Sequence, residues 1–250
     1  MYYVMTDRER LVSFLPPGAV AAEIGVAYGD FSQVMLDRAR PSQLHLIDPW
    51  SHNEASDHDP RGFLDDAAGK DGPAPAPAYN EGGEKIYRDV CARFAGRSEV
   101  AIHRQFSYRI AQQFPERHFD FVYLDGNHTY EFVLQDLLDF GPKVKDEGLI
   151  IGHDFFEDAY ASQHRYGVID AVHRFLHRSR DFRLACLTYE PFQSFVLARK
   201  ATGFAGQFFY NLLESDVFIV EMADDQAFRY EEKQYIRRDG QKRRIPSFAP

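Results

Sequence analysis

Short apolar segments alternate with amphipathic segments along most of this chain, and this alternation limits the possible folds more than any other feature. The clearest apolar segment is Phe119–Leu124 (FDFVYL), which has the character of a buried strand. It is followed by Thr129–Phe140, where apolar side chains recur at the spacing of a helix. Strands and helices in alternation are typical of an α/β fold with a parallel sheet.

Seven strands are predicted, with helices between them. The parallel strands are expected at Ala19–Ile24, Gln43–Ile47, Val100–His103, Phe119–Leu124 and Leu149–Ile151. Two further segments, Arg183–Tyr189 and Ser194–Arg199, flank a Pro-containing turn and predict a terminal antiparallel hairpin. The helices are expected at Arg8–Leu15, Phe31–Ala39, Glu84–Phe94, Tyr108–Phe114, Thr129–Phe140 and Val168–His177. The chain is therefore expected to form a doubly wound, mostly parallel seven-stranded sheet.

The predicted organisation is one α/β domain over residues 1–200 with two additions. Residues 51–83 are rich in Asp, Pro and Gly and have little apolar periodicity, so they form either a disordered insert or a lid over a site. Residues 201–250 form an aromatic and basic extension. Its grouped rings are expected to supply substrate walls or to bury a dimer interface, and they are Phe204, Phe208, Phe209 and Tyr210.

Composition and charge exclude several classes of protein. The net charge of −9 disfavours the broad basic surface that binds duplex nucleic acid. No apolar run reaches the roughly 18 residues of a membrane span, and the first residues lack the pattern of a signal peptide. Two cysteines, Cys91 and Cys186, are too few for a disulfide framework. These features predict a cytoplasmic protein without a membrane partner.

The charge is unevenly distributed along the chain. Residues 229–250 hold seven Lys and Arg against three Asp and Glu, a net charge of +4, while residues 1–228 hold 22 against 35, a net charge of −13. One interpretation is a solvated tail with local ion pairs. The other is a basic arm that closes over an acidic partner or a phosphorylated substrate.

Polar residues gather where the predicted strands end. Ligands of open α/β sheets bind beyond the carboxyl ends of the strands, so these residues are the candidates for a site. A buried carboxylate without a partner is costly, which means that the acids among them need a ligand or a bonded neighbour. The candidates are Glu23, Gly25, Asp48, Ser107, Asp125, His128, His153 and Asp154.

The first strand leads into a glycine-containing turn, EIGVAYG, that ends at Gly29. Glycines let the backbone approach a ligand closely, and the helix that follows favours a polar or anionic group at its start. Asp48 ends the next strand, where an acid can reach the hydroxyls of a ribose. The pair predicts a cofactor that contains adenosine, and the alternative is a tight turn without a ligand.

Asp125 and Asp154 end neighbouring strands, so their carboxylates are expected to face one another. Two close carboxylates repel unless a cation or a shared proton offsets them, and Mg²⁺ suits such a pair. Ligation by His153 or His128 would shift the preference toward Mn²⁺, Fe²⁺ or Zn²⁺. His128 is also placed for proton abstraction. The alternative is structural, with the acids capping loop N–H groups and the histidines packed beside them.

Four segments together resemble class I S-adenosylmethionine-dependent methyltransferases, which have a Rossmann-like fold. They are AEIGVAYGDFS (22–32), LHLIDPW (44–50), FDFVYLDGNHTYEFVLQDL (119–137) and PKVKDEGLIIGHDF (142–155). The resemblance is strongest to a bacterial group that shares features with macrolide-sugar O-methyltransferases and cephalosporin-hydroxylase-like proteins.

The resemblance implies a role for each matching position. Glu23, Gly25 and Gly29 would hold the methionine part of the cofactor, Asp48 its ribose, and Ser107 would lie beside the adenine. The implied ligands of a divalent metal are Asp125, His153 and Asp154, and Asp125 also counts among the cofactor-binding residues. His128 stands where the catechol enzyme has its lysine base, and His153 stands where an acid is more usual. Either histidine would be the base.

The implied function is O-methylation of a small-molecule or sugar hydroxyl in a natural-product or polysaccharide pathway, with Mg²⁺ or Mn²⁺ assisting. The basic tail mildly favours an anionic acceptor, and a homodimer is expected. Other functions remain open. A nicotinamide-dependent oxidoreductase would bind NAD(P)H, a hydroxylase component would transfer no methyl group, and a binding or assembly module would tolerate loss of the Asp125 and Asp154 carboxylates.

Overall fold

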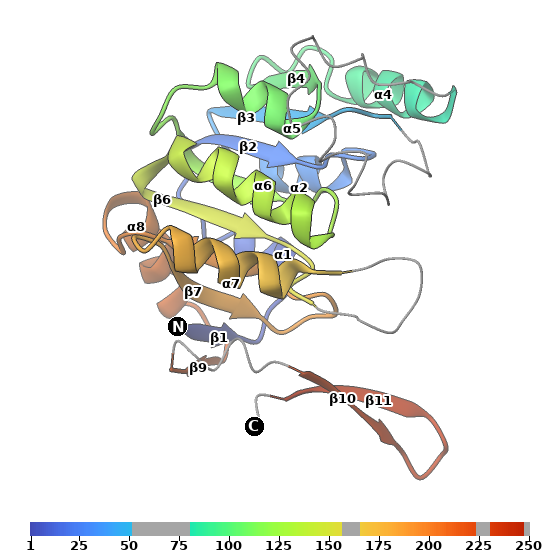
Figure 1. The fold of residues 1–250 in the computed structure, drawn as a ribbon, viewed down its shortest axis with the longest axis vertical. Helices are drawn as coiled ribbons and strands as arrows, with labels where there is room; N and C mark the ends of the chain where they lie inside the picture. The colour runs from blue at the N-terminus through green and yellow to red at the C-terminus, as the bar shows by residue number, and fades with distance from the viewer. Residues whose placement is uncertain (52–80, 157–165, 224–230, 248–250) are drawn as a thin grey trace.

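The computed structural model describes residues 1–51, 81–156, 166–223 and 231–247, and nine strands within these residues form one sheet (Figure 1). The strand order is β4-β3-β2-β5-β6-β8-β7-β1-β9. The strands are β1 (Tyr2–Val4), β2 (Val20–Ile24), β3 (Gln43–Asp48), β4 (Val100–Arg104), β5 (Phe119–Leu124), β6 (Val144–Gly152), β7 (Arg183–Thr188), β8 (Phe195–Ala198) and β9 (Ile219–Glu221). The first five strands in this order, β4, β3, β2, β5 and β6, are parallel to one another. Strand β8 is antiparallel to both of its neighbours, β6 and β7.

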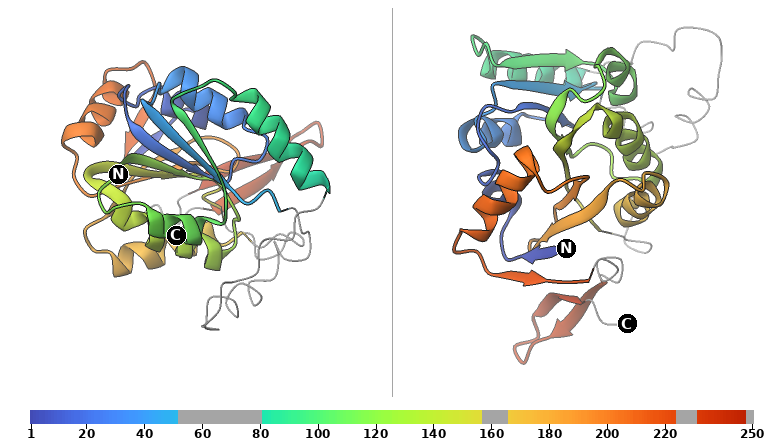
Figure 2. Two further views of the ribbon diagram at one scale, coloured as in Figure 1. Left: turned by 90° about the horizontal axis from the view of Figure 1, so that it is seen from above. Right: turned by 90° about the vertical axis from the view of Figure 1, so that its left-hand side faces the viewer.

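Helices cover both faces of the sheet, as the alternating pattern predicts (Figure 2). One core packs α1 (Arg8–Val12), α2 (Asp30–Arg38), α4 (Glu81–Arg93) and α8 (Gly203–Leu213) on the sheet, and the other packs α5 (Ser107–Ile110), α6 (Tyr130–Phe140) and α7 (Val168–Arg178). Strand β5 serves both cores because successive strand side chains point to opposite faces, so Tyr123 joins the first core and Val122 the second.

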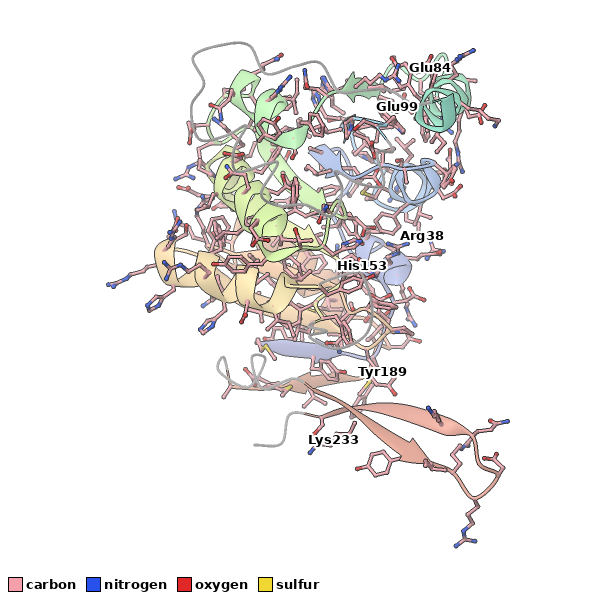
Figure 3. All side chains as sticks on the ribbon, turned by 45° about the vertical axis from the view of Figure 1, so that its right-hand side comes forward. Arg38, Glu84, Glu99, His153, Tyr189 and Lys233 are labelled. Carbon is pink, nitrogen blue, oxygen red and sulfur yellow. The ribbon has the colours of Figure 1, made fainter. Side chains whose placement is uncertain are left out.

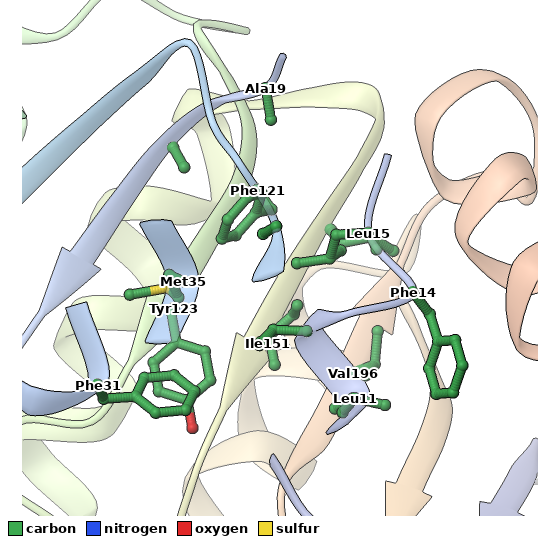
Figure 4. Packing of buried hydrophobic residues seen from close by; sticks show 14 of the residues in the cluster. Leu11, Phe14, Leu15, Ala19, Phe31, Met35, Phe121, Tyr123, Ile151 and Val196 are labelled. Atoms are coloured by element: carbon green, nitrogen blue, oxygen red, sulfur yellow. The ribbon is translucent and has the colours of Figure 1, made fainter. Parts of the chain in front are cut away.

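The first core joins the N-terminal helices to the centre of the sheet. Phe31 and Met35 of α2 lie beside Tyr123 of β5 (Figure 4), and the ring centroids of Phe31 and Tyr123 are 4.4 Å apart. Phe121 of the same strand belongs to the same core. Asp7 caps the N-terminus of helix α1, and its Oδ1 accepts a hydrogen bond of 2.8 Å from the Arg10 N–H. This cap sets the position of Arg8, the first residue of the helix, at the carboxyl edge of the sheet.

The expected seven-stranded, mostly parallel sheet is corrected to a mixed sheet of nine strands among the described residues. All seven predicted strands exist, and β7 and β8 do pair antiparallel. The additional strands β1 and β9 lie beyond β7 and have three residues each. Segments this short show no apolar period, and only their pairing with β7 and with each other makes them strands.

The C-terminal extension contributes to the fold of the domain. Phe208 and Phe209 of α8 are buried in the first core, so these two rings do not provide the expected substrate wall or dimer interface. The reason is that α8 returns to the sheet instead of projecting from it. Two further strands, β10 (Glu231–Ile236) and β11 (Lys242–Ser247), form a separate antiparallel hairpin.

The predicted insert at 51–83 falls mostly on residues 52–80, which lie outside the described residues. Its last residues begin α4 at Glu81. None of the helices in the described ranges is both long and apolar enough to cross a membrane.

Candidate active site

Three parallel strands bring the candidate residues together at one edge of the sheet. The register pairs Ile24 of β2 with Leu124 of β5, and Leu124 with Gly152 of β6. The residues that follow each strand are therefore level with one another. Asp125 comes directly after β5, and His153 with Asp154 directly after β6.

The side chains at this edge form a continuous series of contacts in which basic and acidic groups alternate. The Arg8 guanidinium lies 2.7 Å from Asp125 Oδ2. His153 Nδ1 lies 3.6 Å from Asp125 Oδ1 and 3.4 Å from Asp154 Oδ2, so this ring stands between the two carboxylates. His128 Nδ1 lies 3.0 Å from Asp154 Oδ2. Figure 3 shows His153 at the edge of the sheet above Tyr189.

Burial and these contacts shift the pKa values of three side chains at this edge. Burial raises the pKa of Asp125, and His153 and Arg8 only partly offset this effect. Burial also acts to raise the pKa of Asp154, but hydrogen bonds from His128 and His153 outweigh it and hold that pKa well below its ordinary value. Burial acts to lower the pKa of His128, and the bond to Asp154 outweighs it, so the net shift is upward. The contact between His128 and Asp154 therefore shifts the pKa values of the two groups in opposite directions.

The backbone at Asp154 supports a functional interpretation of the edge. Its φ of 55° lies in the left-handed region, where side chains other than glycine are uncommon. Backbone strain of this kind persists only when the surrounding structure holds it, and it is often found at active sites.

The rings of His128 and His153 line a small hollow that also contacts Asn127, Asp136 and Phe195. His128 is stacked on Tyr166 with centroids 5.2 Å apart and an interplanar angle of 9°. The hollow and the stacked ring leave the two histidines facing a partly apolar space next to the carboxylates.

Two positions of the turn after β2 have no room for a side chain and require glycine. Gly25 has a φ of 89°, and a Cβ at this position would lie 2.3 Å from the Asp125 carbonyl oxygen. Gly29 has a φ of 76°, and a Cβ there would lie 2.8 Å from the Phe94 ring. Both glycines are therefore required for packing, and Gly25 allows the loops after β2 and β5 to touch.

Asp48 lies beside this turn and holds it in place. Its Oδ2 accepts hydrogen bonds of 2.9 Å from the N–H groups of Val26 and Ala27, and its Oδ1 accepts one of 2.6 Å from Trp50. The buried Trp50 indole donates in turn to the Ala27 carbonyl at 2.8 Å. Asp48 therefore lies beside the turn, as predicted. It also caps the backbone N–H groups of the turn.

Comparison with known proteins assigns the family. A model of a methyltransferase domain matches residues 22–155, which is more than half of the chain. The chain belongs to this methyltransferase family. Its members use S-adenosylmethionine, so the protein is an S-adenosylmethionine-dependent methyltransferase. No curated protein sequence matches it.

Several solved structures are similar to this methyltransferase. A proposed rRNA methylase from Clostridium thermocellum is 10% identical, with a TM-score of 0.51 over 78% of this chain and 94% of that one. A Corynebacterium glutamicum protein is 12% identical with a TM-score of 0.49, covering 78% and 79% of the two chains. The tRNA methyltransferase TrmK of B. subtilis is 12% identical with a TM-score of 0.48, covering 78% and 67%. At these identities the likeness concerns the fold alone.

Two of the predicted cofactor residues of the methyltransferase are bonded within the chain. Glu23 is buried between β2 and α2, accepts a hydrogen bond from the Ser32 hydroxyl, and has a pKa raised well above its ordinary value by burial. Ser107 bonds to the buried Asp136, and burial outweighs this bond in raising the pKa of Asp136 to about 7. Burial thus favours the neutral form of both acids.

The donor set at the edge fits a divalent cation. Asp125, His128 and Asp154 each offer one ligand atom, and these atoms lie within 4.8 Å of one another. The predicted set had His153 in place of His128. Both rings contact Asp154, so the methyltransferase presents two carboxylates and either imidazole to an ion.

The sequence did not indicate Arg8, Trp50 or Tyr166 as site residues. Arg8 begins a short helix far from the four matching segments, and only the tertiary structure brings it to Asp125. Trp50 is within the segment LHLIDPW, which was a signal for its role at the turn. Tyr166 has no motif around it and is placed by its stacking on His128.

Proposed function

We propose that this methyltransferase transfers a methyl group to a hydroxyl oxygen of a small molecule or sugar, with His128 as the general base and a divalent cation at the Asp125–Asp154 edge. The observation that carries the proposal is the 3.0 Å contact between His128 Nδ1 and Asp154 Oδ2 next to the hollow. A natural-product or polysaccharide pathway would supply such an acceptor.

His128 has the surroundings that a base needs. Asp154 engages Nδ1, which leaves Nε2 to take the proton from the acceptor hydroxyl. Stacking on Tyr166 restricts rotation of the ring, so the imidazole is oriented before an acceptor binds. An acid that orients a histidine and stabilises its protonated form is a recurrent arrangement in enzymes.

The cofactor would lie over the glycine turn, with Asp48 near its ribose and Gly25, Gly29 and Glu23 near its methionine part. When bound, S-adenosylmethionine supplies a methyl group already activated by its sulfonium. The protein therefore has to position the acceptor, exclude water and remove one proton.

A cation would be held by the Asp125 and Asp154 carboxylates together with one of the two histidines. Such an ion lowers the pKa of a coordinated hydroxyl. Arg8 already balances part of the charge on Asp125 and keeps that carboxylate oriented toward the edge.

The acceptor would bind against a group of rings beside His128. Tyr166 has its ring centroid 5.9 Å from that of Phe156 and 5.7 Å from that of Phe192. Phe192 is 41% exposed. Such rings suit a planar aromatic acceptor or the apolar face of a sugar.

The first test is calorimetric titration of S-adenosylhomocysteine, the product of the cofactor, in EDTA and then with Mg²⁺ or Mn²⁺, with NADH as a competitor. Micromolar binding of the product without binding of NADH supports the proposal, and Asp48→Ala should abolish that binding. A heat of metal binding that is lost in Asp125→Ala supports the cation site.

Methyl transfer is then measured with isotope-labelled S-adenosylmethionine and a panel of phenols, sugars and anionic hydroxy compounds. A base-stable ether product supports O-methylation. Methylation of nitrogen or carbon, or the binding of NADH alone, contradicts it. Full biological function of Asp125→Ala and Asp154→Ala variants would favour a binding or assembly module.

A further inference from the structure

Exposed apolar side chains gather at one end of the methyltransferase. Nearly all the large exposed ones among the described residues belong to the β1–β9 end of the sheet, α8 or the hairpin, with Tyr28 as the exception. Phe218, beside β9, is 66% exposed, and its carbonyl accepts a hydrogen bond from the Met5 N–H. Tyr189 is 43% exposed, and its N–H donates to the Val4 carbonyl. We call Met5, Tyr189, Phe218 and Val220 the apolar edge.

Strand β9 is the last strand of the sheet in the described part of the chain, so its outer side is an open edge. An exposed edge strand presents unpaired N–H and C=O groups that favour pairing with another chain. Proteins usually protect such edges, and apolar residues such as Phe218 and Val220 do the opposite.

The β10–β11 hairpin is poorly covered at its outer end. Tyr235 is 52% exposed and Ile236 is 76% exposed. Because successive strand residues point to opposite faces, neither face of the hairpin is covered at this point. In Figure 1 the hairpin extends beyond the β9 edge, and its turn is the part farthest from the sheet. A two-stranded hairpin is only marginally stable in water, so this one needs a surface to pack on.

The distribution of charged residues indicates which kind of surface the hairpin would bind. Arg237, Arg238 and Lys242 are exposed around the turn of the hairpin. Three exposed acids lie at or beside β9, and they are Glu214, Asp216, which also pairs with Arg10, and Glu221, the last residue of the strand. The whole segment 229–250 carries +4 and the rest of the chain −13. Another copy of this chain therefore presents both the apolar strip and the acids that the hairpin would contact.

We propose that the apolar edge and the hairpin form the interface of a homodimer, in which the hairpin of each copy packs on the β9 edge of the other. A two-fold axis satisfies both copies at once because each one carries the hairpin and its complementary surface. The pairing would cover the open strand, the exposed rings and the unsupported hairpin together.

The interface also adjoins the candidate active site. Phe192 lies in the turn between β7 and β8, three residues after Tyr189, and its ring contacts Tyr166 and Phe156 beside His128. Tyr189 belongs to the apolar edge, so the partner's hairpin would cover the side of the sheet from which Phe192 reaches the acceptor rings.

The test is the mass of the full-length protein in solution, by light scattering and sedimentation velocity from about 1 to 100 µM. We expect twice the chain mass of 28.9 kDa. The double substitution Tyr235→Asp/Ile236→Asp should produce monomers. Charge reversal by Arg237→Glu, Arg238→Glu and Lys242→Glu should raise the dimer dissociation constant at least tenfold at low salt.

Tyr28→Asp is the matched control, because Tyr28 is 62% exposed but lies after β2, far from β9 in the strand order. It should leave the mass unchanged, and circular dichroism confirms that each variant is folded. A monomer at 100 µM overturns the proposal, as does a dimer that neither hairpin variant weakens. A monomer that binds an RNA or an acidic protein through Arg237 and Arg238 would also overturn it. The mass does not depend on catalysis, so this test is independent of the proposed function.

Discussion

Two groups of histidines lie on the same sheet and have opposite surroundings. At the carboxyl edge, His128 and His153 contact the Asp125 and Asp154 carboxylates. In the other group, His45 Nδ1 lies 2.8 Å from His103 Nε2, among the rings of His118, Phe114 and Phe119. The pKa of His128 is raised, and that of His45 is lowered to about 4, mainly by burial.

The difference shows that the residue type alone does not indicate a reactive site. An imidazole beside a carboxylate can hold and release a proton near neutral pH, because the acid stabilises the charged ring. An imidazole among aromatic rings stays neutral and acts as a packing group with one hydrogen bond. We therefore assign chemistry to the edge and a structural role to the His45 group.

The largest effect is expected when the acid of the edge is removed. Asp154→Asn keeps the size of the side chain but removes the charge that orients His128, so the rate of methyl transfer should fall by about 1,000-fold. Binding of S-adenosylhomocysteine, measured by calorimetry, should change less than threefold. A rate within tenfold of the wild type would remove Asp154 from the mechanism and weaken the contrast between the two groups.

The His45 group should affect stability instead of catalysis. The pKa of His45 is about 4 in the folded protein and 6.5 for an unperturbed imidazole, so the unfolded chain binds more protons between these pH values. Acidification from pH 6.5 to 4 should therefore cost up to about 3 kcal/mol of stability through His45, with no further loss from His45 below pH 4.

His45→Phe removes this titration while keeping a ring in the cluster. Urea unfolding at several pH values should then show a shallower loss of stability from pH 6.5 to 4. The same slope in the variant and the wild type would mean that another group causes the acid sensitivity. Methyl transfer at pH 8 should be similar in both proteins.

Substitutions of Arg8 test whether this guanidinium is needed to balance the charge of Asp125. Arg8→Ala leaves the half-buried Asp125 with only imidazoles, those of His153 and His128, as basic neighbours, so methyl transfer should fall by about tenfold. Arg8→Lys should recover part of the loss because it restores the charge without the guanidinium geometry. An Arg8→Ala variant with full activity at all metal concentrations would show that Asp125 does not need this partner.

The smallest effect is expected at histidines outside both groups. His173 and His177 lie on α7 and are exposed. Substituting both with Asn should change stability by less than about 0.5 kcal/mol and activity by less than twofold. A larger change would mean that α7 carries a function that neither histidine group explains.

Much of the edge could be predicted because it depends on chain order. The strand Phe119–Leu124 was predicted with its observed bounds, so Asp125 was expected at its end. The predicted segments Ala19–Ile24 and Leu149–Ile151 overlap the strands β2 and β6, which lie on either side of β5. A parallel sheet brings strand ends to one side, and this rule was sufficient to group Asp125, His153 and Asp154.

Other features could not be predicted because they depend on distances between elements. The three-residue strands β1 and β9 have no period of their own. The sequence around Phe208 and Phe209 does not show whether their rings pack into the core or face outward. In the structure, α8 places both rings in the core.

The α/β alternation and the ends of the central strands follow from the order of residues in the chain, and with them the set of polar residues at the carboxyl edge. The contacts of His128 with Asp154, of Arg8 with Asp125 and of Asp48 with the glycine turn arise from the packing of the folded chain. The physical reason is that periodicity reflects which face of an element is buried, whereas the partner of a charged side chain depends on the packing of distant elements within a few ångströms.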